Sequence, residues 1–394
     1  MKRVFILALL VAWPVLAGAQ DFSGNIAAEA IGFPNPAKFP NQLSDDLSLS
    51  FQPRLAGDWN EGDDNWSVEL FMRAGSKDEN CNHFDVRELL WLHLSGDNEW
   101  RVGVNTMFWG VTETRHLVDV INQIDLVEGI DGEDKLGQQM IHLKHYEDWG
   151  VLDFLVLPGF RERNFPGERG RPRFPLIVDE SQTIYESADG KDHIDYSFRF
   201  SQTYNELDIG LSFFKGTNRQ PELIPGLGAT GAPVLIPVYL QMTQYSIDAQ
   251  LTTEEWLWKL EVIHRDTKTR SYQAFTGGFE YTFYSVFDSD INLGTLAEYS
   301  YNGPEAPKRD VFDNDLFLGA RLAFNDAAST DLLAGYVVDI EKGSQTFRLE
   351  ASRRFGDSWK GTLEMQLFPY TADDDLLVIF EDDDYLLLEL ARFF

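Results

Sequence analysis

A cluster of five arginine residues stands out in a chain that is otherwise strongly acidic. The cluster consists of Arg161, Arg163, Arg169, Arg171 and Arg173. Guanidinium groups bind carboxylates and phosphates through paired hydrogen bonds, so the cluster could line an anion-selective narrowing. A simpler interpretation is an external loop whose arginines pair with neighbouring acidic loops.

The long segment 109–137 carries a second set of candidate residues. Thr112 could cap a short helix that has Leu117, Val118 and Ile121 on one face. A short helix in a long loop can fold into a β-barrel and narrow it. The other faces of this helix would carry Arg115, His116, Asp119 and Asn122, which join the five arginines as candidates for a pore constriction.

Acidic residues gather near the end of the chain, on both sides of residues 376–380. The two tracts are Asp373, Asp374 and Asp375, and Glu381, Asp382, Asp383 and Asp384. Carboxylate oxygens suit Ca²⁺ or Mg²⁺, so divalent cations are possible partners of these loops. The spacing matches no calcium-binding loop, however, and a solvated acidic face is the simpler interpretation. We therefore predict no metal ligands and no cofactor.

The charge and the motifs exclude several function classes. The chain has 64 acidic and 33 basic residues, a formal charge of −31, so its field repels nucleic acid and other polyanions. The sequence contains no Gly-x-Ser-x-Gly, no His-Glu-x-x-His and no phosphate-binding glycine loop. A hydrolase would need the fold to bring His93 or His116 together with distant Ser and Asp residues. We therefore predict that the protein is not an enzyme.

The elements that would position these residues are strands. Alternating apolar and polar residues indicate strands of about 10 residues, the length that crosses a membrane. We predict eighteen, at residues 24–31, 45–56, 64–75, 84–94, 99–108, 138–146, 150–158, 192–202, 206–215, 239–251, 256–265, 272–283, 289–300, 312–323, 328–339, 345–355, 359–368 and 384–394.

The connections between the predicted strands alternate between short turns and long loops. This alternation predicts an all-β fold, a transmembrane antiparallel up-and-down β-barrel with eighteen strands, or sixteen if one hairpin is miscounted. A barrel of either size has a lumen too wide for side chains alone to fill. By alternation, the lumen candidates are Glu69, Arg73, Arg87, Arg101, Asp195, Arg199, Lys259, Glu261, Arg348, Glu350, Lys360 and Glu364.

The start of the chain has the pattern of a secretory signal. Lys2 and Arg3 precede the apolar run 4–16, and Ala17-Gly18-Ala19 follows it. We predict cleavage after Ala19, which leaves residues 20–394 as the barrel. No later stretch approaches the roughly 18 to 20 apolar residues that a membrane helix needs.

The last strand carries a resemblance to a known class of proteins. Leu386, Leu388, Leu390 and Phe394 form one apolar row, and the chain ends on that aromatic residue. It resembles bacterial outer-membrane β-barrel proteins, whose final strand typically ends in Phe and is the recognition signal for the assembly machinery. Arg392 departs from that pattern. The segment around Trp109-Gly110 and 119–126 also resembles porin-like barrel proteins of undefined function, although Gln123 stands where a Pro is usual.

The resemblance implies a place in the outer membrane of a Gram-negative bacterium. The partners would be outer-membrane lipid, lipopolysaccharide, whose phosphates the arginine cluster could bind, and the assembly machinery. The expected function is a porin-like channel for small hydrophilic solutes or ions, without covalent chemistry. The alternative is a plugged barrel that binds or exports a lipid or a cell-surface polymer, and an outer-membrane hydrolase is a third possibility.

Overall fold

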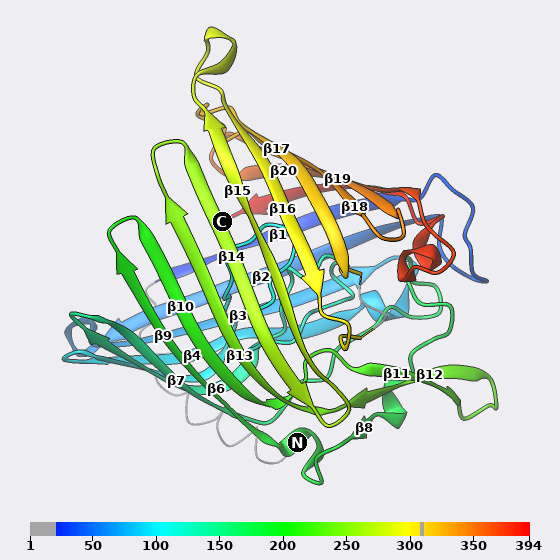
Figure 1. Cartoon of the computed structure of the whole chain (residues 1–394), viewed down its shortest axis with the longest axis horizontal. Coiled ribbons are helices and arrows are strands. Elements are labelled where there is room, and N and C mark those ends of the chain that lie inside the picture. The colour runs from blue at the N-terminus through cyan, green and yellow to red at the C-terminus, as the bar shows by residue number, and fades with distance from the viewer. Residues whose placement is uncertain (1–20, 308–310) are drawn as a thin grey trace.

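The computed structural model describes residues 21–307 and 311–394. Within these residues, eighteen antiparallel strands form one sheet (Figure 1). In chain order they are β1 (Asp21–Gly32), β2 (Asp45–Trp59), β3 (Asp64–Gly75), β4 (His83–Ser95), β5 (Asn98–Asn105), β6 (Gln138–Glu147), β7 (Gly150–Pro158), β9 (Ile194–Tyr204), β10 (Leu207–Thr217), β13 (Gln241–Thr252), β14 (Trp256–Thr267), β15 (Ser271–Phe283), β16 (Asn292–Asn302), β17 (Asn314–Ala323), β18 (Asp331–Asp339), β19 (Gln345–Phe355), β20 (Trp359–Tyr370) and β21 (Tyr385–Phe393).

The sheet closes on itself where the last strand meets the first. Strand β21 pairs antiparallel with β1, from Asn25 opposite Phe393 to Gly32 opposite Leu386. Beyond that ladder, Gly24 and Phe394 exchange two backbone hydrogen bonds of 3.1 Å. Closure removes the exposed edges that an open sheet of this size would present. The prediction of a closed antiparallel barrel with eighteen strands is confirmed.

Replacing Phe394 with Ala is expected to reduce the fraction of protein that folds into detergent or lipid. The ring of Phe394 lies 5.2 Å from Phe22 and 6.2 Å from Phe51, so it packs across the seam between the two ends of the chain. Heat-modifiable migration on a gel measures the folded fraction. Phe355→Ala is the control, because Phe355 is also an exposed aromatic residue and it ends β19 away from the seam. Equal yields for the two variants would contradict a special role for Phe394.

The two faces of the barrel wall differ as the alternation predicts. In β2, Leu47 and Leu49 are about 60% exposed on the outside, whereas Asp46 and Ser48, which alternate with them, are buried. An apolar outer face suits contact with lipid, and a polar inner face suits water. The predicted outer row of the last strand follows the same rule, with Leu386, Leu388 and Leu390 exposed.

Short turns and long loops occupy opposite ends of the barrel, and the long loops carry a second small sheet. It consists of β8 (Ile184–Tyr185), β11 (Glu222–Leu227) and β12 (Pro233–Tyr239), seen beside the loop end in Figure 1. The sequence predicts long loops in these regions, which the structure has, and gives no indication of the strands within them. Pro225, Pro233 and Pro237 interrupt the strand pattern there, because proline lacks the N–H that a ladder needs.

The helices of the described ranges are 3₁₀ turns of three to five residues. None of them is long and apolar enough to cross a membrane. The helix predicted to begin after Thr112 is absent, since residues 111–122 have no helical assignment. The predicted signal peptide, residues 1–19, lies outside the described residues.

Candidate functional site

The loop between β5 and β6, residues 106–137, crosses the inside of the barrel, and we call it the lumen segment. Its Asp125 forms an ion pair of 2.6 Å with Arg87 of β4. From the same segment, Asp131 reaches Arg348 of β19 at 2.7 Å. Because β4 and β19 lie far apart around the barrel, a segment that contacts both must run through the lumen.

A buried carboxylate on the barrel wall anchors the start of the lumen segment. Glu261 of β14 is fully buried and accepts hydrogen bonds from the backbone N–H groups of Val111, Thr112 and Val118, at 2.7, 3.2 and 3.1 Å. In a helix that began after Thr112, the amides of Val111 and Thr112 would have no intrahelical partner, whereas the amide of Val118 would bond to the carbonyl of Thr114. Glu261 takes the Val118 amide instead, and the backbone here is not helical.

A second wall carboxylate acts in the same way. Glu298 of β16 accepts hydrogen bonds from the backbone N–H of Glu113 at 2.7 Å and of Thr114 at 3.0 Å. The side chain of Glu113 then pairs with Arg321 of β17 at 2.8 Å. Further along the lumen segment, burial raises the pKa of Asp119, and the nearby charge of Lys135 opposes that shift without cancelling it. The segment is therefore held by carboxylates that lie on different strands.

Apolar residues hold the same segment against one side of the barrel. Leu117, Val118 and Ile121, which the sequence places together on one face, are at most 5% exposed. They pack in one cluster with inward-facing residues of the wall, which include Met140, Leu155, Phe214, Met242 and Ile263. The lumen segment therefore covers the wall from β6 to β14 and leaves space next to the opposite wall.

The four polar candidates of the lumen segment have different positions. His116 lines the space beside the segment and contacts Glu133 at 2.9 Å. Asp119 is buried and pairs with Lys135 at 3.1 Å. Arg115 donates to the side chain of Asn302 and to the carbonyl of Phe312, both at 3.0 Å. Asn122 donates to the carbonyls of Asn105 and Leu136, at 2.9 Å each, and so joins the two ends of the segment.

The arginine cluster lies in the loop between β7 and β9 and mostly ties loops together. Arg161 pairs with Asp85 at 2.6 Å. Arg171 pairs with Asp383 at 2.7 Å, and both side chains are fully buried. Arg173 donates to the carbonyl of Pro40 at 2.8 Å, Arg163 donates to Gln123 at 3.1 Å, and Arg169 is exposed.

These contacts bear on the two interpretations of the cluster. The pairing of Arg171 with Asp383 joins the cluster to the second acidic tract, as the interpretation of paired outer loops expects. Arg163 and Arg173 also line the space beside the lumen segment, as a narrowing requires. In the acidic tracts themselves, Asp383 and Asp375 are buried, whereas Asp373 and Asp374 are exposed.

The twelve lumen candidates lie on the inner face of the wall. Many form ion pairs across strands, as Arg199 does with Asp248 at 2.6 Å, or with the lumen segment, as Lys259 does with Glu113 at 3.4 Å. The others are Glu69, Arg73, Arg87, Arg101, Asp195, Glu261, Arg348, Glu350, Lys360 and Glu364. Their effect on ion selectivity stays a prediction.

A space of about 1790 Å³ runs between the lumen segment and the wall formed by β15 to β20, and we call it the passage. At its outer end it is lined by Asn218 and Leu376, which belong to the long loops. At the other end it reaches Asp331 and Ser352, which lie next to the short turns. Two ion pairs bridge it, Arg321 with Glu113 and Arg348 with Asp131.

A smaller cavity of about 350 Å³ lies on the other side of the lumen segment, next to the seam between β1 and β21. Its ionisable lining residues are Glu29, Asp46, Asp78, Glu128, Asp131, Asp134, Glu364, Glu389, Arg73, Arg171 and Lys360. Carboxylates outnumber cations there, and two of those on the lumen segment titrate unusually. Burial raises the pKa of Glu128 to about 7, and burial together with the charge of Asp131 raises the pKa of Asp134 to about 6.

Several residues of the passage are missed by sequence reasoning. Arg321 lies on the inner face of β17, and the strand alternation would have found it. Arg265 lies on β14, where the same alternation would have found it, whereas Glu113 and Asp131 depend on how a loop folds inward, for which the sequence holds no local signal. Arg219 is buried between Asp195 and the rings of Phe160 and Phe214, in a loop with no regular pattern.

Comparison with known proteins adds information on the fold. No family model matches the chain, and no curated protein matches it. Among solved structures, Pseudomonas aeruginosa OpdO has a TM-score of 0.54 at 10% identity, over 96% of this chain and 97% of that one. A second structure, of Pseudomonas aeruginosa OccK3 (OpdO), has a TM-score of 0.52 at 10% identity, over 96% of this chain and 98% of that one. The chain therefore has the fold of a porin-type barrel.

Proposed function

We propose that the protein is an outer-membrane channel that passes small hydrophilic solutes or ions through the passage. The observation that carries this proposal is the extent of the passage from the long loops to the short-turn end of β18 and β19. Its wall carries both charge signs, with Arg321 and Arg348 facing Glu113 and Asp131. Fixed charges in a narrow space select solutes by charge as well as by size. The outward apolar face of the strands supports a place in a membrane.

One feature favours the plugged barrel as a second candidate. Apolar side chains gather at the outer end of the passage, among them Phe174, Phe312, Phe368 and Phe380. An apolar lining suits the body of a lipid or another amphipathic molecule, and the ion pairs that bridge the passage could stop it from moving on. The hydrolase alternative gains no support, because His93 and His116 contact Asp64 and Glu133 but, within the described residues, have no hydrogen bond to a Ser, Thr or Cys side chain that could act as nucleophile.

A cysteine substitution in the passage should make conductance sensitive to a charged thiol reagent. We expect Ser352→Cys in a Cys81→Ser background to form open channels in planar bilayers whose conductance falls when a methanethiosulfonate reagent is added, because Ser352 lines the passage. Leu388→Cys is the matched control, since Leu388 is exposed on the outer face. Folded protein without channel activity would favour the plugged barrel, and block of the Leu388→Cys variant would contradict the assigned path.

A further inference from the structure

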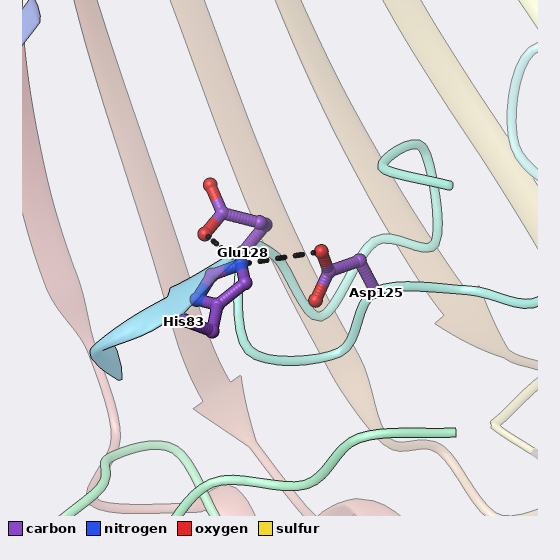
Figure 2. A group of neighbouring side chains, drawn as sticks. All are labelled: His83, Asp125 and Glu128. Carbon is purple, nitrogen blue, oxygen red and sulfur yellow. Dashed lines mark ion pairs between the residues drawn. The ribbon is translucent and has the colours of Figure 1, made fainter. Parts of the chain in front are cut away.

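His83, Asp125 and Glu128 bring three potential metal-binding atoms together at the edge of the lumen segment (Figure 2). The Nε2 atom of His83, at the start of β4, lies 3.1 Å from Oε1 of Glu128 and 3.4 Å from Oδ2 of Asp125. The three atoms all lie within 4.8 Å of one another. Two ligand atoms bound to one tetrahedral Zn²⁺ at about 2.1 Å are separated by about 3.4 Å, which is close to both distances from His83.

The atoms that face one another differ in their other hydrogen bonds. Oδ2 of Asp125 accepts one from Nη2 of Arg87 at 2.6 Å. Nδ1 of His83 lies 3.2 Å from the carbonyl of Cys81, and in the tautomer that donates to this carbonyl the lone pair of Nε2 faces the carboxylates. Nε2 of His83 and Oε1 of Glu128 are both buried and have no hydrogen-bond partner. A proton on Nε2 can bridge these atoms as an imidazolium–carboxylate contact, and a metal ion bound by all three atoms would take the place of that proton.

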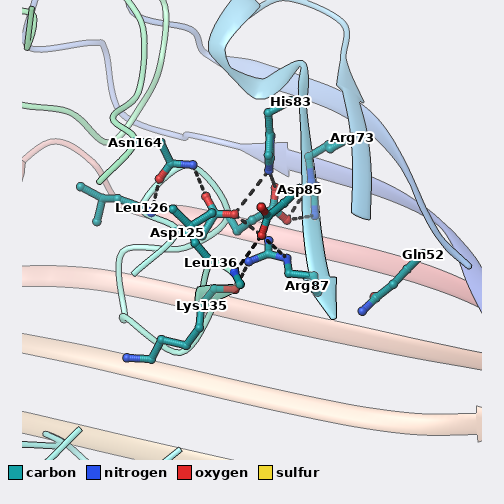
Figure 3. A network of polar contacts seen from close by, with 12 residues as sticks. Gln52, Arg73, His83, Asp85, Arg87, Asp125, Leu126, Lys135, Leu136 and Asn164 are labelled. Carbon is teal, nitrogen blue, oxygen red and sulfur yellow. Dashed lines mark hydrogen bonds and ion pairs between the residues drawn. The ribbon is translucent and has the colours of Figure 1, made fainter. Parts of the chain in front are cut away.

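Neighbouring side chains orient the two carboxylates (Figure 3). Arg73 holds Oε2 of Glu128 at 2.8 Å, and Arg87 holds Asp125 at 2.6 Å. Each arginine also contacts a carboxylate of the wall, since Arg73 lies 2.8 Å from Glu29 and Arg87 lies 3.6 Å from Asp85. Arg161 also pairs with Asp85, at 2.6 Å. Three arginines therefore face the four carboxylates of Glu29, Asp85, Asp125 and Glu128, which leaves one negative charge to attract a cation.

We propose that His83, Asp125 and Glu128 bind one divalent first-row transition-metal ion, with Zn²⁺ as the best fit. An imidazole nitrogen with two carboxylate oxygens is a donor set for such ions, whereas Ca²⁺ and Mg²⁺ prefer oxygen ligands alone. Glu128 also lines the acidic cavity beside the seam, so water in that cavity can supply the remaining ligand. Because His83 belongs to the wall and the carboxylates belong to the lumen segment, the ion fastens the segment to β4.

Calorimetric titration of untagged protein tests the proposal. The protein is folded in detergent, treated with EDTA and titrated with ZnCl₂, and with MgCl₂ as the comparison ion. We expect one Zn²⁺ site that Mg²⁺ does not compete for, and an affinity at least about tenfold lower in His83→Gln and in Glu128→Gln. His264→Gln is the control, because His264 lies 3.1 Å from Asp266 but belongs to no such three-residue group. The His264→Gln variant should bind Zn²⁺ with the affinity of the unaltered protein.

A spectroscopic measurement keeps the test independent of how the variants fold. Co²⁺ bound to the unaltered protein should absorb visible light more strongly than the free aqua ion, as ions with four or five ligands do, and Glu128→Gln should lose this absorption. An aqua-ion spectrum would overturn the proposal. So would weak binding at many sites with equal affinity in all variants, because that result describes loose attraction to an acidic surface.

Discussion

Deleting residues 113–128, with a short Gly-Ser linker between Thr112 and Gly129, is expected to raise single-channel conductance about threefold. A barrel of eighteen strands has an aqueous lumen when no loop fills it, and the lumen segment occupies the side of the lumen next to β6 to β14. The deletion removes the ion pair of Glu113 with Arg321 that bridges the passage. Planar-bilayer recordings at constant salt measure the effect.

The control for this deletion shortens a connection at the opposite end of the barrel. The turn 284–291 between β15 and β16 projects from the short-turn end (Figure 1) and has no residue in the lining of the passage. Replacing it with a tight Asn-Gly turn should leave conductance unchanged. If both deletions gave the conductance of the unaltered protein, solutes would cross by a route that the lumen segment does not control.

The strands could be predicted because the outer face of the wall suits lipid and the inner face suits water, so apolar and polar residues alternate along each strand. Ile194 and Tyr196 are exposed outside, whereas Asp195 and Ser197 are buried inside, and the sequence alone separates these pairs. Strand ends are less well determined. The strand predicted at 289–300 is found at Asn292–Asn302, because the turn before it contains its own 3₁₀ helix.

The candidate site could be predicted only in outline. The sequence indicates that the loop after β5 enters the lumen, but its conformation depends on Glu261 and Glu298, which are more than 140 residues further along the chain. The spacing of Leu117, Val118 and Ile121 correctly groups these residues, because they share a buried cluster although no helix forms. The local pattern therefore predicts which residues pack, while distant carboxylates decide the backbone that carries them.

The arginine cluster shows a related limit. Five arginines in sequence suggest one positive site, yet the fold distributes them among separate contacts. Arg161 and Arg171 pair with Asp85 and Asp383, and neither arginine lines the passage. The arginines that bridge the passage, Arg321 and Arg348, come from strands β17 and β19. Selectivity should therefore respond to these two.

Replacing both Arg321 and Arg348 with Gln is expected to shift the channel toward cations. A unit charge about 8 Å from the ion path contributes about 0.5 kcal/mol in water and about 0.2 kcal/mol after screening at ~0.1 M salt. Because K⁺ and Cl⁻ respond in opposite directions, by roughly 1.4-fold each, their concentration ratio changes roughly twofold for each arginine. Each replacement also removes an arginine partner from a carboxylate, and this adds to the shift. Glu113 keeps its contact with Lys259 at 3.4 Å, so this addition is larger at Asp131. We expect the ratio of K⁺ to Cl⁻ permeability to rise about fourfold, measured as a reversal potential in a KCl gradient.

The matched control changes the same residue type at an exposed position. Arg169 belongs to the arginine cluster but is exposed and does not line the passage, so Arg169→Gln should leave the reversal potential unchanged. Heat-modifiable migration verifies that the double variant folds. High salt should shrink its shift, because the fixed charges act over a Debye length that falls from about 10 Å at 0.1 M to about 3 Å at 1 M. An equal shift in Arg169→Gln, or none in the double variant, would mean that ions do not pass between the lumen segment and β17 to β19.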